Sequence, residues 1–252
     1  MIGGPDRGPR LTFSSQNPRL EETLKSIPIL LLVLLMLLSV SAAQNSPART
    51  DVYHVHFATA APGKAVQLAD SFKTPLPNDP MPGHTIVLRH NYGDAWDYVV
   101  IQHMGTKATV EATPSAIPSS VRDLYAWHND TYANGPSWAE FTRAMGIGDQ
   151  ASKTSGSEYV VSVYRAVPAH RDQLEKMLGA APQPGAAGNV IMQHLEGGPW
   201  NYLSIVRFSS WHDLATSETN DAAQMSKNQG PWFDMRDHTS FHNDTLADRI
   251  VP

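Results

Sequence analysis

Two short segments of the chain place a histidine two residues before an aspartate. His128 and Asp130 lie in one HNDT sequence, and His242 and Asp244 lie in a second. On a strand, residues i and i+2 point to the same face, so each copy would present an imidazole beside a carboxylate. Such a pair can act as a base with its orienting acid, or as two ligands of a divalent metal. The structural alternative is that both side chains bond to turn or helix-end backbone.

Two further histidines, His54 and His56, share a face of the strand that we expect at 52–58. A His-x-His spacing on a strand is a known arrangement of metal ligands. His90 and His103 are expected on adjacent strands, so this histidine cluster is our best candidate for a metal or haem-type site.

The positions that correspond to His54 and His56 in the second half of the chain are Val160 and Ser162. The second half therefore cannot hold the same site. One working half and one structural half would diverge in this way, and so would sequence drift.

Aromatic residues flank two predicted hairpins at matching positions. On each hairpin a tryptophan and a tyrosine two residues apart are expected on the same side. They could bind a flat ligand, although buried aromatic residues more often fill a core. The candidate ligand-binding residues are Trp96, Tyr98, Trp200, Tyr202, His90 and His194.

The HNDT segments belong to a longer internal repeat. Residues 122–133 read RDLYAWHNDTYA and residues 236–247 read RDHTSFHNDTLA, with seven of twelve positions identical. A repeat of this length indicates duplication of a structural unit. It preserves packing as readily as it preserves a site, so it fixes architecture before it assigns a role.

Each half is predicted to contain the same order of elements, β-α-β-β-α-β. Alternation of apolar and polar residues indicates the strands, and Pro62 and Pro168 precede the first helices. The first half has strands at 52–58, 85–90, 96–103 and 128–133, with helices at 63–72 and 109–125. The second has strands at 158–166, 189–194 and 200–208, a helix that Pro168 opens, a helix at 211–225, and the second HNDT segment.

This order is that of the ferredoxin-like split βαβ unit, whose sheet carries helices on one face and needs cover on the other. Two tandem units packed sheet to sheet would supply that cover in an α+β fold. The chain thus resembles the dimeric α+β barrel superfamily in a tandem-fused form, which includes antibiotic-biosynthesis monooxygenase-type and stress-responsive barrel proteins. The superfamily also includes haem enzymes, isomerases and proteins with no known activity, so the resemblance does not choose a reaction.

A targeting segment is expected at the N-terminus. Residues 27–40 are apolar, follow Lys25, and precede the small residues Ser41, Ala42 and Ala43, as in a cleaved signal peptide. The alternative is an uncleaved membrane anchor. The predicted division is a signal peptide at 1–43, a polar lead-in at 44–50, repeat 1 at 51–133, a linker at 134–157 and repeat 2 at 158–252, with export to the periplasm or medium.

Composition narrows the function classes. The chain has no cysteine, which excludes disulfides and thiolate catalysis. Its net charge of −5 and lack of a basic patch argue against a nucleic-acid partner. We expect an exported protein that binds a small organic molecule in a barrel pocket. The alternatives are a cofactor-free, metal- or haem-dependent monooxygenase-like enzyme, and a purely structural or interaction protein; the sequence names no cofactor and no oligomeric state.

Overall fold

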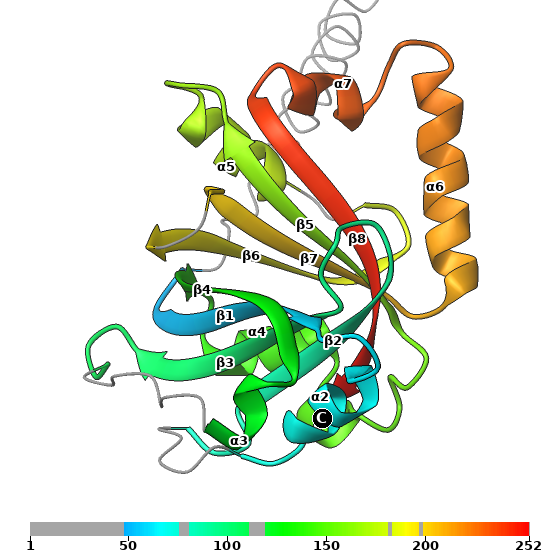
Figure 1. The fold of residues 1–252 in the computed structure, drawn as a ribbon. Helices are drawn as coiled ribbons and strands as arrows, with labels where there is room; N and C mark the ends of the chain where they lie inside the picture. Colours follow the sequence, from blue (N-terminus) through cyan, green and yellow to red (C-terminus); the bar gives the residue numbers. More distant parts are fainter. Residues whose placement is uncertain (1–47, 76–80, 111–118, 181–182, 197–198, 252) are drawn as a thin grey trace, which may run out of the picture. The chain divides into compact units, whose positions relative to one another are not determined.

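The computed structural model describes residues 48–75, 81–110, 119–180, 183–196 and 199–251. The predicted signal peptide and most of the polar lead-in lie outside these residues. In the described part, eight strands form a closed barrel in the order β1-β3-β2-β8-β5-β7-β6-β4, and β4 pairs back onto β1 (Figure 1). The strands are β1 (Asp51–Ala60), β2 (Thr85–Tyr92), β3 (Tyr98–Thr106), β4 (Tyr125–Gly135), β5 (Glu158–Ala166), β6 (Ala186–Glu196), β7 (Tyr202–Phe208) and β8 (Thr239–Val251).

All eight strand pairings are antiparallel. The first half has the order β4-β1-β3-β2 and the second half has the order β8-β5-β7-β6, so the two halves follow one plan. We expected two sheets packed face to face. Instead, β2 pairs with β8 and β4 pairs with β6, so hydrogen-bonded strands join the halves edge to edge. Closure into a barrel removes the exposed sheet edges that open halves would have.

Each predicted strand is observed, although β3 and β7 begin two residues later than predicted, at Tyr98 and Tyr202. Both HNDT segments lie on strands longer than expected, β4 and β8. The helix predicted at 109–125 is observed only as α3 (Ser119–Arg122); residues 111–118 lie outside the described part. The other helices are α2 (Ala65–Ser71), α4 (Trp138–Met145), the 3₁₀ turn η1 (Gly148–Gln150), α5 (Arg171–Leu178), α6 (Trp211–Met225) and α7 (Pro231–Arg236). The long helix α6 runs along the outside of the barrel (Figure 1), where it contacts β6 and β7.

The segment that we expected as a linker, 134–157, contains α4. Ser137 caps this helix by accepting a hydrogen bond from the backbone N–H of Glu140, whose side chain bonds back to the Ser137 N–H. Gly146 ends the helix in the left-handed conformation, with φ 65°, which glycine adopts without steric cost. Phe141 and Met145 of α4 are fully buried in the main core, so α4 is part of the barrel's packing.

Alternate residues of the strands fill the inside of the barrel. From β1 these are Tyr53, Val55 and Phe57, and from β5 they are Tyr159 and Val161. Burial of large side chains on this scale is the dominant stabilising contribution to folding. The inner face is therefore a packed core.

Two smaller clusters lie on other parts of the strands. One joins Leu68 of α2 to Ala58, Val87 and Tyr98, and the other joins Leu174 of α5 to Tyr164 and Tyr202. Leu68 and Leu174, each preceded by a glutamine on the first helix of its half, thus occupy corresponding positions in the two halves. No helix among the described residues is both long enough and apolar enough to cross a membrane.

Candidate functional site

The two histidine patterns of the first half meet on one face of β1 and β4. In the pairing of these strands, His56 lies opposite Asp130 and Ala58 lies opposite His128. The side chains of His54 and His56 therefore stand beside the His-x-Asp pair of the HNDT segment. From the sequence these were two separate candidate sites. The strand register makes them one His–Asp cluster of His54, His56, His128 and Asp130.

Three imidazoles converge on the single carboxylate of this cluster. The Oδ1 atom of Asp130 lies 2.7 Å from Nδ1 of His56 and 3.0 Å from Nε2 of His54. The Oδ2 atom lies 2.8 Å from Nδ1 of His128. Burial would raise the pKa of Asp130, but hydrogen bonds from His54 and His56 and their positive charge outweigh it and hold that pKa well below its usual range. Asp130 therefore stays ionised near neutral pH.

The His–Asp cluster is buried at one end and open at the other. The His56 side chain is 7 % exposed, whereas those of His128 and Asp130 are 43 % and 39 % exposed. The rings of Tyr125 and Phe72 both pack edge-on against the His56 ring, with centroids 5.4 Å and 6.5 Å from it. Among the residues that the structure describes, Nε2 of His56 has no hydrogen-bond partner. A small molecule or ion could reach the open end, while the buried end is held by aromatic packing.

The charge of Asp130 affects the pKa of Tyr125, one of the two aromatic residues that pack against His56. Burial, with a smaller contribution from the charge of Asp130, raises the pKa of Tyr125 to about 12. Tyr125 therefore keeps its proton near neutral pH and presents a neutral phenol next to His56 and His128.

The second half holds a reduced version of this arrangement. Nε2 of His242 lies 3.5 Å from Oδ2 of Asp244, and Arg236 donates to Nδ1 of His242 at 3.1 Å. Ser162 occupies the place opposite Asp244 that His56 has in the first half. The duplicated HNDT pairs are therefore unequal: His242 and Asp244 lack the two additional imidazoles.

The expectation that His90 and His103 join His54 and His56 is wrong. His103 lies opposite Tyr53 in the register of β1 and β3, which places it on the inner face of the sheet. His90 packs against Trp96, with ring centroids 5.8 Å apart. Alternation along β3 explains the difference, because position 103 has the parity of the core residues Val99 and Ile101.

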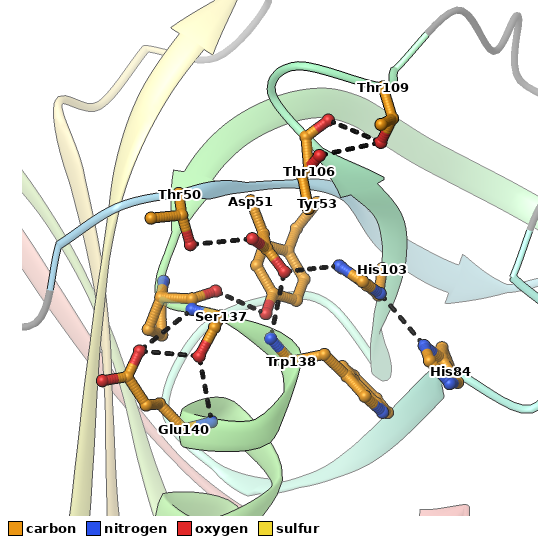
Figure 2. Close-up of polar contacts among 11 residues, drawn as sticks. Thr50, Asp51, Tyr53, His84, His103, Thr106, Thr109, Ser137, Trp138 and Glu140 are labelled. Carbon is orange, nitrogen blue, oxygen red and sulfur yellow. Dashed lines mark hydrogen bonds and ion pairs between the residues drawn. The ribbon is translucent and has the colours of Figure 1, made fainter.

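His103 belongs to a second network, which no pattern in the sequence predicted (Figure 2). Its Nε2 lies 2.8 Å from Oδ2 of Asp51, and its Nδ1 lies 3.0 Å from Nδ1 of His84. The backbone N–H of Trp138, the first residue of α4, also donates to Oδ2 of Asp51 at 3.0 Å. The Trp138 ring stacks on both imidazoles. With His103 and Asp51 3 % and 4 % exposed, this network attaches α4 to the barrel.

The hairpin aromatic residues lie in the core. Trp96 and Trp200 are 5 % and 4 % exposed and belong to the main core cluster, and His194 packs against Trp200 at 4.9 Å. Tyr98 and Tyr202 belong instead to the two smaller clusters. The prediction that each tryptophan shares a side with its tyrosine is wrong, because Trp96 and Trp200 precede β3 and β7 and strand alternation does not apply to them.

A hollow of about 560 Å³ lies at another place in the molecule, where residues 151–152 and 154–158 face Asp248 and Arg249 of β8. Glu158 lines it and is 4 % exposed, and its Oε2 atom has no partner among the described residues. Burial and repulsion from Asp248 raise the pKa of Glu158 to about 7. No pattern in the sequence singled out Glu158, which reads as an ordinary strand residue.

The chain matches no protein-family model and no curated protein sequence. It is similar in structure to an anthrone oxidase-like protein, with 12% sequence identity, a TM-score of 0.55, and coverage of 82% of this chain and 94% of that chain. A structure described as "putative monooxygenase from Lactobacillus acidophilus NCFM" is a weaker match, at 11% identity and a TM-score of 0.41 over 79% of this chain and 94% of that one. At this identity the first likeness shows an α+β barrel fold.

Proposed function

We propose that this protein is a monooxygenase-like enzyme that binds a small organic molecule at the His–Asp cluster and oxidises it with dioxygen. The observation that carries the proposal is the convergence of three imidazoles on Asp130, on the outer side of one half only. The likeness to an anthrone oxidase-like protein supports this reaction class. The cluster is buried at His56 and half-exposed at His128 and Asp130. A substrate would therefore enter from the side of His128 and Asp130, with its reacting carbon first.

The substrate class that fits is an aromatic ketone with an acidic C–H group, such as anthrone. Loss of a proton from that carbon gives an enolate, which is electron-rich enough to react with dioxygen. The cluster would accept the proton and stabilise the anion that forms. In the overall reaction the CH₂ group becomes C=O, and dioxygen supplies the carbonyl oxygen while its second oxygen leaves as water.

The architecture that we propose is two tandem ferredoxin-like repeats, each equivalent to one subunit of a dimeric α+β barrel. The identical strand order of the halves and the matched Leu68 and Leu174 support it. We also propose that residues 1–43 direct export and are removed. Mass spectrometry of the N-terminus of protein from the producing cell tests that point, since a chain that retains residue 27 would contradict it.

Dioxygen consumption with anthrone as the probe tests the proposed activity. Wild-type protein is expected to consume dioxygen and form anthraquinone faster than the uncatalysed reaction. Asp130→Asn should reduce the rate by at least about 100-fold, because it removes the charge that orients all three imidazoles. Asp244→Asn, the matched change in the second half, should leave the rate within about twofold.

One result would count against an enzyme, and another would count against the His–Asp cluster as its site. If anthrone stabilises the protein in a thermal-shift assay but is not oxidised, the chain is a binding protein of the kind first expected from the sequence. If Asp130→Asn and Asp244→Asn have equal effects on the rate, the cluster is not the reactive centre.

A further inference from the structure

We propose that the His–Asp cluster binds one divalent transition-metal ion, with His56, His128 and Asp130 as ligands and His54 next to them. This inference deepens the proposed function and rests on it for the use of the ion, whereas the binding itself rests on geometry. One ligand atom from each of His56, His128 and Asp130 lies within 4.8 Å of the others. No other group of this kind occurs among the residues searched, which are those that the structure describes.

The spacing of the ligands needs little change to accept an ion. Nδ1 of His56 and Nδ1 of His128 each lie within 2.8 Å of a different oxygen of Asp130. Bonds of about 2.0–2.2 Å around a tetrahedral ion separate neighbouring ligand atoms by roughly 3.4 Å. A shift of each side chain by a fraction of an ångström would open that space. His128 and Asp130, which are half-exposed, are the residues that can move.

Several possible ligand atoms already meet at the carboxylate of Asp130. His54 and His56 share its Oδ1 atom, and His128 contacts its Oδ2 atom. A cation bound between the rings and the carboxylate would replace these contacts, taking the Nδ1 lone pairs of His56 and His128 together with the charge of Asp130.

The ligand types select the class of ion. Imidazole nitrogen suits Zn²⁺, Co²⁺, Ni²⁺, Cu²⁺ and Fe²⁺, whereas Mg²⁺ and Ca²⁺ prefer oxygen ligands throughout. His54, whose Nε2 lies 3.0 Å from the carboxylate, can serve as a further ligand or hold Asp130 in place. The exposed side of the cluster leaves a coordination position for a substrate oxygen.

The second half provides an internal control. It retains His242 and Asp244, but Ser162 and Val160 replace the imidazoles of His56 and His54. A single imidazole and a carboxylate 3.5 Å apart offer two ligands, too few for tight binding. We therefore expect one ion per chain.

The experiment is a titration of untagged, chelator-treated protein with Co²⁺, followed by visible absorption, and with Zn²⁺, followed by the metal content after dialysis. Wild-type protein should bind one equivalent of either ion and show the intense visible bands of Co²⁺ with four ligands. His128→Ala, a change at a half-exposed position that leaves the core intact, should weaken binding at least tenfold. His56→Ala and Asp130→Asn should do the same, and His242→Ala should bind as wild type does.

Three outcomes would overturn the metal site: no stoichiometric Co²⁺ or Zn²⁺ in wild-type protein, unchanged affinity in folded His128→Ala, or an equal loss in His242→Ala. The metal site and the proposed reaction can fail independently of each other. Stoichiometric binding without anthrone oxidation rejects the reaction and retains the site. Oxidation that continues in metal-free protein retains the reaction and shows that the metal does not serve it.

Discussion

Nε2 of His103 lies 2.8 Å from Oδ2 of Asp51, and both side chains are almost fully buried at the end of the barrel where α4 begins. The same Asp51 oxygen accepts the backbone N–H of Trp138 (Figure 2). One carboxylate therefore holds together β1, β3 and the first turn of α4. Because a buried charge without its partners is costly, this network should be central to stability and not to chemistry.

Asp51→Ala is expected to lower the free energy of unfolding by about 2–5 kcal/mol, since it leaves the imidazole of His103 and the N–H of Trp138 without their shared acceptor, at about 1–3 kcal/mol each. Urea denaturation measures this loss. Hydrogen exchange should also show faster opening of α4 than in wild type. Asp70→Ala removes an exposed carboxylate paired with Lys73 and should cost no more than about 1 kcal/mol. Equal losses in the two variants would show that the Asp51 network does not stabilise the fold.

Trp200→Ala should destabilise the protein by about 3–5 kcal/mol, because the indole is 4 % exposed and its removal leaves a cavity in the main core. Trp127→Ala, at a position 51 % exposed, should change stability by no more than about 0.5 kcal/mol. Thermal or urea unfolding of both variants checks the contrast. A Trp200→Ala protein with wild-type stability would favour a ligand-binding role for this residue over the core role that the structure gives it.

Glu158 should make stability depend on pH. Its pKa is raised from 4.5 to about 7 in the folded chain, mainly by burial, so the folded state binds the proton more tightly than the unfolded state does. This contribution to stability is present below pH 4.5 and is lost as the pH rises through about 7. Glu158→Gln, which is neutral at every pH, should therefore raise the Tm at pH 8, by on the order of 3 °C, and have little effect at pH 4.5.

Thermal unfolding of wild type and Glu158→Gln across this pH range provides the measurement. A difference in Tm that stays constant from pH 4.5 to pH 8 would mean that the Glu158 carboxyl does not titrate in this range. A Tm difference that grows with pH would identify the raised pKa as its cause.

Local patterns predicted the strands because alternation and turn residues act over a few positions. The strand at 158–166 was expected and observed with the same bounds. Helix α4 was missed although its sequence carries a capping box, Ser137 followed by Glu140, and a terminal Gly146. The prediction of a linker at 134–157 did not take that signal into account.

The candidate site could not be predicted as one cluster, because its formation depends on the register between strands, and local sequence patterns do not determine that register. Both the His54/His56 pair and the His128/Asp130 pair were predicted as candidates from their i, i+2 spacing. Only the pairing of β1 with β4, between segments more than seventy residues apart, shows that they form one cluster. Strand alternation also separates His103 from the His–Asp cluster, because its position on β3 places its side chain on the other face of the sheet.

The second half offers a way to build the site anew. Ser162 lies opposite Asp244, as His56 lies opposite Asp130, so Val160→His combined with Ser162→His would recreate the ligand set around His242 and Asp244. The Co²⁺ stoichiometry of this double variant is expected to rise from one to two per chain. Val160→His alone adds one imidazole without the one opposite Asp244 and should leave the stoichiometry at one. Adding Asp244→Asn to the double variant should return it to one, which shows that the new ion uses the second HNDT segment. A folded double variant that still binds a single ion would mean that register is insufficient and that the packing of Phe72 and Tyr125 around His56 is also required.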